Sequence, residues 1–252
     1  MANLDQIKQL NIKYGKNSAL TEETKSYAII EAFIPGIIVE AISDSIRELG
    51  SKFTYYFDLG LPVDVVLLFV DVCRFSTRFA NLTGNEIGEY FDEYYDIVIQ
   101  IIYKYGGEID KIMGDGIVAI FGPPFQNIDL KENIKKADQC SREIIRKTKN
   151  TKFSSKVALH NGKINYFKNK TGLYREYTII GKPVTELFRL ESISFDERIN
   201  YYDETDIKTF YEEKATPEGT SPNNNWNHHR LQIINLKGVE FKHFFTMNYN
   251  KI

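Results

Sequence analysis

Two aspartates, Asp71 and Asp115, lie at the ends of predicted strands, where their side chains should face a cleft. Asp71 ends the apolar run 65–70, which is typical of a fully buried strand. Asp115 lies in a Gly-Asp-Gly turn inside a predicted hairpin over 106–121. Either residue alone would be an ordinary acid of a turn. As a pair they fit Mg²⁺, which prefers carboxylates plus substrate phosphates, and two such ions suit phosphoryl or nucleotidyl transfer.

The elements that must position this pair follow from hydrophobic spacing. Ile109, Lys111 and Met113 are expected to share one face of the hairpin. The other predicted elements are a helix over 89–105, a charged helix over 129–149, a strand over 156–164, a strand passing through Gly181 into a helix, a strand over 198–202, a short helix over 203–213, an aperiodic loop over 214–230, and a closing hairpin from 231–238 and 241–247.

Composition narrows the function classes. The 252 residues, 42% of them hydrophobic, suffice for one large domain or for a medium domain with an extension. A net charge of −2 argues against a nucleic-acid surface. Cys73 and Cys140 lack metal-ligand spacing and fit a reduced cytosol. The apolar segment 27–42 is too short and too interrupted to span a bilayer, so we expect a cytoplasmic protein without a membrane partner.

We divide the chain into an N-terminal helical extension, 1–59, and a catalytic domain, 60–252. Helix starts are predicted near Thr21 and at Pro35, where proline suits a first turn. The second helix would carry an apolar stripe from Ile38 to Leu49, which either packs on the domain or joins two protomers.

Two motifs resemble those of the class III nucleotide cyclases. Residues 69–76, FVDVCRFS, are similar to F-x-D-[IV]-x-G-F-[TS], and 106–122 match G-G-x-x-x-K-x-x-G-D-x-x-x-A-x-F-G. The resemblance implies an α+β fold with an antiparallel-rich, ferredoxin-like, palm-type sheet and packed helices. It makes Asp71, Val72 and Asp115 the residues that hold two Mg²⁺ or Mn²⁺ ions. A diguanylate cyclase resembles this chain at 105–108, but its acid-rich motif breaks down at Ile109.

The same resemblance implies that the loop over 74–76 contacts substrate. Arg74 replaces the usual glycine of this loop, which should lie near the triphosphate, so its cation would either add a phosphate contact or block the backbone's approach. Phe75 and Ser76 follow it as expected substrate-binding residues.

Residues 174–191 are similar to a third family motif, Y-[DT]-x-x-G-x-x-V-N-x-A-x-R-[LM]-E. It implies that Thr178 reads the base together with Lys111, and that Arg189 steadies charge on the α-phosphate. Thr185 replaces the asparagine that contacts the ribose. Lys237, in a Leu-Lys-Gly segment, either reaches the polyphosphate or is an edge-strand lysine. His160 sits in a segment similar to [IL]-H-x-G, and we interpret it as a satisfied core histidine.

Together these motifs imply a lyase that forms a 3′,5′-cyclic nucleotide and pyrophosphate in a head-to-tail homodimer with shared sites. Lys111 with Thr178 resembles one branch of adenylyl cyclases, whereas Arg74, Thr185, the bulky pair 187–188 and the expected free-standing form look more like the pyrimidine cyclases of Pycsar antiphage defence. We therefore favour UTP or CTP, with a separate effector that responds to the product. The alternatives are an ATP-specific adenylate cyclase and a catalytically silent dimer that binds nucleotide.

Overall fold

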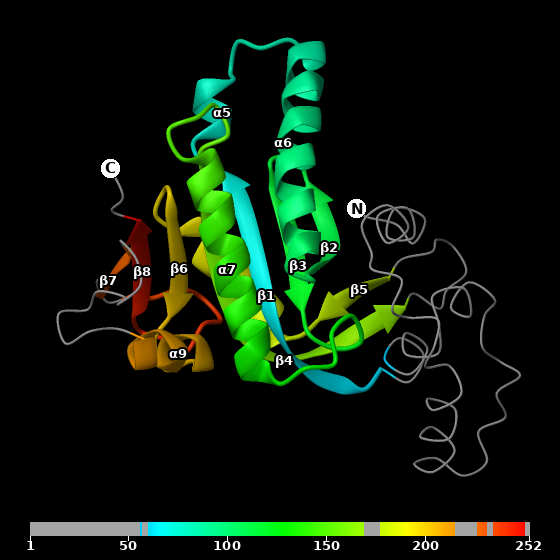
Figure 1. The fold of residues 1–252 in the computed structure, drawn as a ribbon, viewed down its shortest axis with the longest axis vertical. Helices are drawn as coiled ribbons and strands as arrows, with labels where there is room; N and C mark the ends of the chain where they lie inside the picture. The colour runs from blue at the N-terminus through cyan, green and yellow to red at the C-terminus, as the bar shows by residue number, and fades with distance from the viewer. Residues whose placement is uncertain (1–55, 57–59, 169–176, 215–225, 231–233, 250–252) are drawn as a thin grey trace, which may run out of the picture.

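The computed structural model describes residues 56, 60–168, 177–214, 226–230 and 234–249 (Figure 1). The helices expected from Thr21 and Pro35 lie outside these residues, as does nearly all of the proposed 1–59 extension. The division of the chain at residue 60 therefore stays a prediction.

Eight strands form one sheet, with five described helices around it. The strands are β1 (Pro62–Val72), β2 (Glu108–Met113), β3 (Gly116–Phe121), β4 (Ser155–Lys168), β5 (Tyr177–Ile180), β6 (Arg198–Tyr202), β7 (Trp226–Arg230) and β8 (Phe244–Tyr249). The helices are α5 (Phe75–Arg78), α6 (Gly84–Lys104), α7 (Leu130–Thr148), α8 (Lys182–Ser192) and α9 (Asp206–Lys214).

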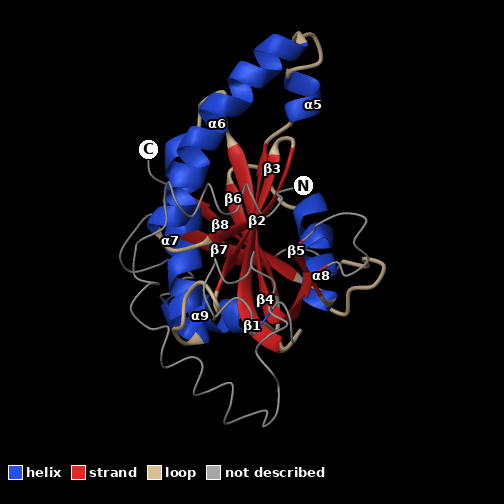
Figure 2. Ribbon diagram, turned by 90° about the vertical axis from the view of Figure 1, so that its right-hand side faces the viewer, coloured by secondary structure: helices blue, strands red, loops and turns tan. Residues whose placement is uncertain are grey.

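The sheet order is β2-β3-β1-β4-β6-β8-β7, and β5 pairs with β4 off this path. Every pair is antiparallel except β4 with β6. Helices α6, α7 and α9 cover one face, and α8 covers the other, as Figure 2 shows edge-on. This layered, antiparallel-rich α+β arrangement confirms the predicted fold class.

The buried strand β1 separates two hydrophobic cores. Its side chains alternate between faces, so Leu68 joins the core under α6 and α7, whereas Leu67 joins the core under α8. Both leucines are fully buried. A strand covered on both faces needs an uninterrupted apolar sequence, which is the pattern that predicted it.

The helices begin at residues whose side chains satisfy the first free N–H groups. Thr83 and Glu86 form a reciprocal capping box at the start of α6, five residues before the predicted start. Asp129 accepts the backbone N–H of Glu132 at 2.7 Å, which starts α7 where the charge pattern predicted it.

Gly181 makes the sharp passage from β5 into α8. Its φ is 148°, and a Cβ there would lie 3.2 Å from the carbonyl oxygen of Lys163 on β4. Only glycine accepts that backbone conformation at such close range. Pro183 in the first turn of α8 then supports the helix start, because its fixed φ suits that position.

The C-terminal hairpin differs from the prediction. Residues 226–230, assigned to a loop, form β7 and pair with β8. Of the predicted strand over 231–238, residues 231–233 lie outside the described part and 234–238 are not a strand. Strand β7 forms because β8 supplies its hydrogen bonds. Its own polar sequence does not favour a strand. None of the helices that the structure describes combines the length and the hydropathy that a membrane crossing needs.

Candidate active site

Asp71 and Asp115 lie together at one end of the sheet. Asp71 is the next-to-last residue of β1, and Asp115 stands in the turn between β2 and β3. In the antiparallel register Val70 faces Ile117, which brings that turn beside Asp71. The two carboxyl groups are close enough for the charge of Asp115 to help raise the pKa of Asp71, after burial. Gly116 permits this approach, because a Cβ there would come within 2.7 Å of the Phe69 ring.

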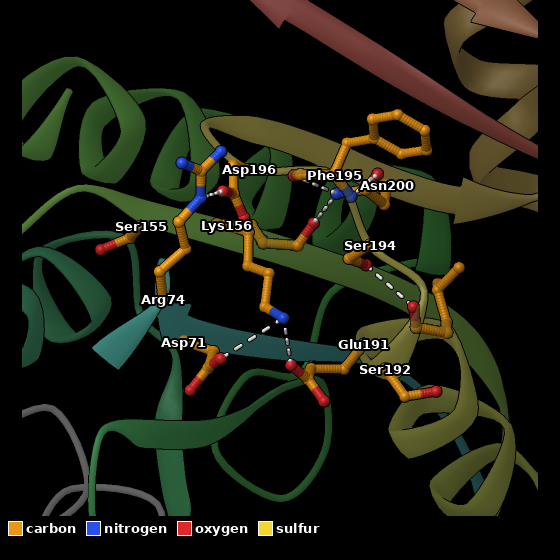
Figure 3. Close-up of polar contacts among 12 residues, drawn as sticks. Asp71, Arg74, Ser155, Lys156, Glu191, Ser192, Ser194, Phe195, Asp196 and Asn200 are labelled. Carbon is orange, nitrogen blue, oxygen red and sulfur yellow. Dashed lines mark hydrogen bonds and ion pairs between the residues drawn. The ribbon is translucent and has the colours of Figure 1, made fainter. Parts of the chain in front are cut away.

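Two further charged residues complete the cluster, and sequence reasoning missed both. Lys156 lies opposite Asp71 in the register of β1 with β4, and Glu191 is in the last turn of α8. The Lys156 Nζ is 2.8 Å from Glu191 Oε1 and 3.5 Å from Asp71 Oδ2. Figure 3 shows this ammonium between the two carboxylates. The position of Lys156 could have been expected from the pairing of β1 with β4, but not from residue spacing alone.

The cluster holds three carboxylates and one ammonium in a poorly hydrated place. Burial, followed by the charges of Asp115 and Glu191, raises the pKa of Asp71 from 3.8 to about 7, although Lys156 opposes this. Burial also raises the pKa of Asp115. For Lys156, burial lowers the pKa, but the contacts with Glu191 and Asp71 outweigh it and raise the pKa above its ordinary value.

These donors fit Mg²⁺ or Mn²⁺. Asp71 and Asp115 are hard oxygen ligands, and their pKa values are raised first by burial and then by neighbouring negative charge such as that of Glu191. Among the described residues, no three His, Cys, Asp or Glu side chains are arranged to hold one ion. A pair of carboxylates suits ions that complete their coordination with substrate phosphates and water.

Arg74 points away from this cluster. Its Nε donates to Asp196 Oδ2 at 2.9 Å, and three quarters of its side chain is exposed (76%) (Figure 3). Its backbone is left-handed, with φ of 57°. That conformation favours glycine, which explains in physical terms why an arginine is unusual at this position.

The neighbours of Arg74 are mostly structural. The Val72 side chain is buried, so only its backbone carbonyl is left to face a metal. Phe75 packs its ring 4.9 Å from Phe79 and 5.1 Å from Phe91, between α5 and α6. Ser76 is exposed on α5. Of the three residues over 74–76, only Ser76 is left with a side chain that is neither paired nor packed in these contacts.

The structure brings Lys111 and Thr178 together, and it adds Asp110. Lys111 Nζ donates to Thr178 Oγ1 at 3.0 Å and lies 3.0 Å from Asp110 Oδ2. A bulge in β2 makes this possible, because the register shifts between Ile109 and Lys111. Ile109 belongs to the core under α6 and α7, while Lys111 pairs with Val118 of the opposite core. The expectation that Ile109 and Lys111 share a face was therefore wrong.

The remaining predicted residues face solvent. Thr185 and Arg189 lie one turn apart on the exposed side of α8. Lys237 is exposed in a turn closed by a hydrogen bond from Val239 N to Leu236 O of 3.1 Å. These two cations and one hydroxyl are therefore accessible from outside the protomer.

His160 is a core histidine, as predicted, but it is not fully satisfied, because its Nδ1 has no hydrogen-bond partner among the described residues. It is buried, its Nε2 lies 3.1 Å from Glu186 Oε2, and the Tyr202 ring packs edge-on against it. The bulky pair 187–188, the feature compared above with pyrimidine cyclases, packs inside the protomer. Leu187 is fully buried in the core under α8, and Phe188 packs edge-on against Phe69 at 5.1 Å.

Known proteins share this fold. No protein-family model matches the sequence. The photoactivated adenylate cyclase subunit alpha of Euglena gracilis is 24% identical over 104 residues, and its alpha-like protein ST- is 26% identical over the same length. Each match covers 41% of this chain and 10% of the relative, so the chain matches only about a tenth of their length.

Solved structures match over far more of the chain. The guanylate cyclase domain of RhGC from Catenaria anguillulae, in complex with GTP, superimposes with a TM-score of 0.61 and 16% identity, over 75% of this chain and 97% of that one. The adenylyl cyclase CyaB from P. aeruginosa gives a TM-score of 0.61 and 20% identity, over 76% and 96%. At these identities the likeness shows the fold.

Proposed function

We propose that this chain, which has the fold of a class III nucleotide cyclase catalytic domain, converts a nucleoside triphosphate into a 3′,5′-cyclic nucleotide and pyrophosphate. The observation that carries the proposal is the crowded pair of Asp71 and Asp115 at the end of β1. Both acids that the reaction needs are present and adjacent. The contact between Lys111 and Thr178 supports a second, base-reading part of the same site.

Asp71 and Asp115, with the backbone of Val72, would hold two Mg²⁺ or Mn²⁺ ions. When bound, such ions lower the pKa of the attacking ribose 3′-hydroxyl and neutralise the polyphosphate. Lys156 offsets part of the carboxylate charge while the ions are absent, because its ammonium lies between Asp71 and Glu191. It thus reduces the repulsion between Asp71 and the neighbouring Glu191.

We propose that the active unit is a head-to-tail homodimer. Asp71 and Asp115 of one protomer would meet Lys111, Thr178 and Arg189 of the other. The exposure of Arg189 on α8 supports this, because a buried arginine would have no way to reach a second chain. Arg189 would donate to the α-phosphate as charge develops there, and Lys237 would contact the polyphosphate. Thr185 would supply one hydroxyl near the ribose, where the family has an amide.

We further propose that UTP or CTP is preferred over ATP and GTP. An ammonium at Lys111 donates as readily to a pyrimidine carbonyl as to a purine ring nitrogen, and the departures at Arg74 and Thr185 set the chain apart from purine cyclases. We propose that the product acts in the cytoplasm, on a separate effector in bacterial antiphage defence. The free thiols of Cys73 and Cys140 suit that reducing compartment.

The test is to incubate the full chain with each of the four nucleoside triphosphates and Mn²⁺, and to measure pyrophosphate and cyclic nucleotide. Asp71→Ala and Asp115→Ala should lose both products, while Asp64→Ala, which changes an exposed acid of the same β1 strand, should keep them. Preference for ATP would favour an adenylate cyclase. Nucleotide binding without pyrophosphate release would favour the silent dimer.

A further inference from the structure

Asp110 is a buried acid that the proposed reaction leaves without a role. It is 6% exposed, in the bulge of β2, where its side chain faces β5. Its Oδ2 lies 3.0 Å from Lys111 Nζ, and its Oδ1 lies 3.4 Å from Thr178 Oγ1. With the 3.0 Å contact between Lys111 and Thr178, the three side chains form a closed triangle.

The hydrogens of this triangle have little freedom. The Lys111 ammonium has only donors, so the Thr178 oxygen must accept from it. The hydroxyl proton of Thr178 then turns to Asp110, whose carboxylate only accepts. Of the three Lys111 N–H groups, one donates to Thr178, while the ammonium forms an ion pair with Asp110 Oδ2. The triangle therefore offers a ligand only donors from Lys111, and one acceptor lone pair on Thr178.

We propose that Asp110 is a positioning residue that fixes the hydrogen-bonding polarity of Thr178, and through it the choice between oxo and amino bases. The inference rests on the proposed function, in which Lys111 and Thr178 contact the base. Asp110 itself would never touch the substrate. It would act by holding the Thr178 hydroxyl as an acceptor, beside a Lys111 that can only donate.

The two kinds of base differ at the atoms such a pair would read. Uracil presents a carbonyl beside a ring N–H, whereas cytosine presents an amino group beside a bare ring nitrogen. Hypoxanthine and adenine repeat the same contrast in a purine. For any fixed orientation of the base, either the oxo base or the amino base matches the donor of Lys111 and the acceptor of Thr178. The other base of the pair leaves polar groups without a hydrogen-bond partner.

Asp110→Asn should reverse this polarity. An amide oxygen at position 110 still accepts from Lys111, but its NH₂ group donates to Thr178 and releases the hydroxyl proton toward the ligand. Thr178 then becomes a donor. The preference within UTP and CTP, and within ITP and ATP, should move toward the member that the wild type disfavours, by about tenfold or more.

The experiment measures kcat/KM in mixtures of each nucleotide pair, together with equilibrium binding of the same four nucleotides by calorimetry. Asp110→Ser, which also frees the hydroxyl, should move the ratios in the same direction as Asp110→Asn and covers the case in which that variant does not fold. Thr178→Val should flatten the ratios, and Asp110→Asn should add nothing in that background. Glu108→Gln changes another buried acid of β2, bonded to Tyr103, and should leave the ratios unchanged.

Two results would overturn the inference. One is a folded Asp110 variant whose ratios stay within about threefold of wild type while nucleotides still bind and turn over. The other is a further effect of Asp110→Asn in the Thr178→Val background, because Asp110 would then act by another route. Absence of binding and turnover for all four nucleotides in the wild type would instead overturn the proposed function, and this inference with it.

Discussion

Replacing Asp71 by asparagine should make the metal-free protein more stable at neutral and alkaline pH while abolishing its activity. In the folded chain the pKa of Asp71 is raised from 3.8 to about 7 by burial and by Asp115 and Glu191. Between those values the folded protein keeps a proton that the unfolded chain has released. Stability therefore falls as pH rises through this window, and the full cost is present above about pH 7. Asparagine does not ionise and avoids that cost.

The structure sets the size of the effect. About three pH units separate the two pKa values, and each is worth about 1.4 kcal/mol, which gives an upper limit of about 4 kcal/mol. Water still reaches the cluster, since 18% of the Asp71 side chain is exposed, and the charge is shared with neighbouring acids. We expect about 2 kcal/mol, or roughly 4–8 °C in Tm for a chain of this size.

The assay is thermal unfolding in EDTA at pH 8 and at pH 4, with Asp64→Asn as the control. Asp64 is an exposed acid at the other end of β1, and its variant should melt like wild type at both pH values. The advantage of Asp71→Asn should be present at pH 8 and absent at pH 4. Adding Mn²⁺ at pH 8 should raise the Tm of the wild type and leave that of the variant nearly unchanged. A variant that melts no higher than wild type at pH 8, or whose advantage persists at pH 4, would refute the reasoning.

Three further predictions concern catalysis and local strain. Mixing Asp71→Ala protein with Arg189→Ala protein should restore activity, because one site of the heterodimer then carries no mutation; a mixture that stays inactive after proven subunit exchange contradicts the shared site. Lys111→Ala should lower kcat/KM about ten- to a hundredfold, from loss of a charged hydrogen bond of ~1.5–3 kcal/mol, and a loss below threefold contradicts base contact. Arg74→Gly should be more stable than Arg74→Ala by about 1 kcal/mol in denaturant unfolding, since both lose the ion pair with Asp196 but only glycine relieves the left-handed backbone. Equal stabilities would argue against strain at that residue.

Elements whose signals are local could be predicted from the sequence. The apolar run of β1, the turn at Asp115 and the capping residue Asp129 each act within a few positions, and each element formed where expected. The strand over 226–230 could not be predicted in this way. Its polar sequence has no alternation, and it is a strand because β8 lies beside it. Pairing between segments overrides local preference there.

The same contrast between local signals and pairing of distant segments applies to the residues of the candidate site. Lys111 and Thr178 were predicted through motifs, and the structure brings them together. Lys156 and Asp110 were missed because their positions depend on strand register, and Glu191 was missed because its contact with Lys156 joins α8 to β4. Lys156 meets Asp71 only because β1 and β4 pair at those residues, and the bulge in β2 defeats any count of alternating positions. If side chains are assumed to alternate between faces without a break at the bulge, Lys111 is assigned to the wrong face of the sheet.

From the distribution of charge we expect one protomer alone to make a poor site for a triphosphate. Around Asp71, three carboxylates outnumber the single ammonium of Lys156, so the place repels a polyanion until divalent cations bind. The cations suited to phosphate, Arg189 and Lys237, stand on exposed surfaces. In the proposed dimer, separating acids from bases would keep Arg189 from neutralising the proposed metal ligands within its own chain. Charge of both signs would then meet only when metal, nucleotide and a second copy assemble, which would tie the proposed activity to all three.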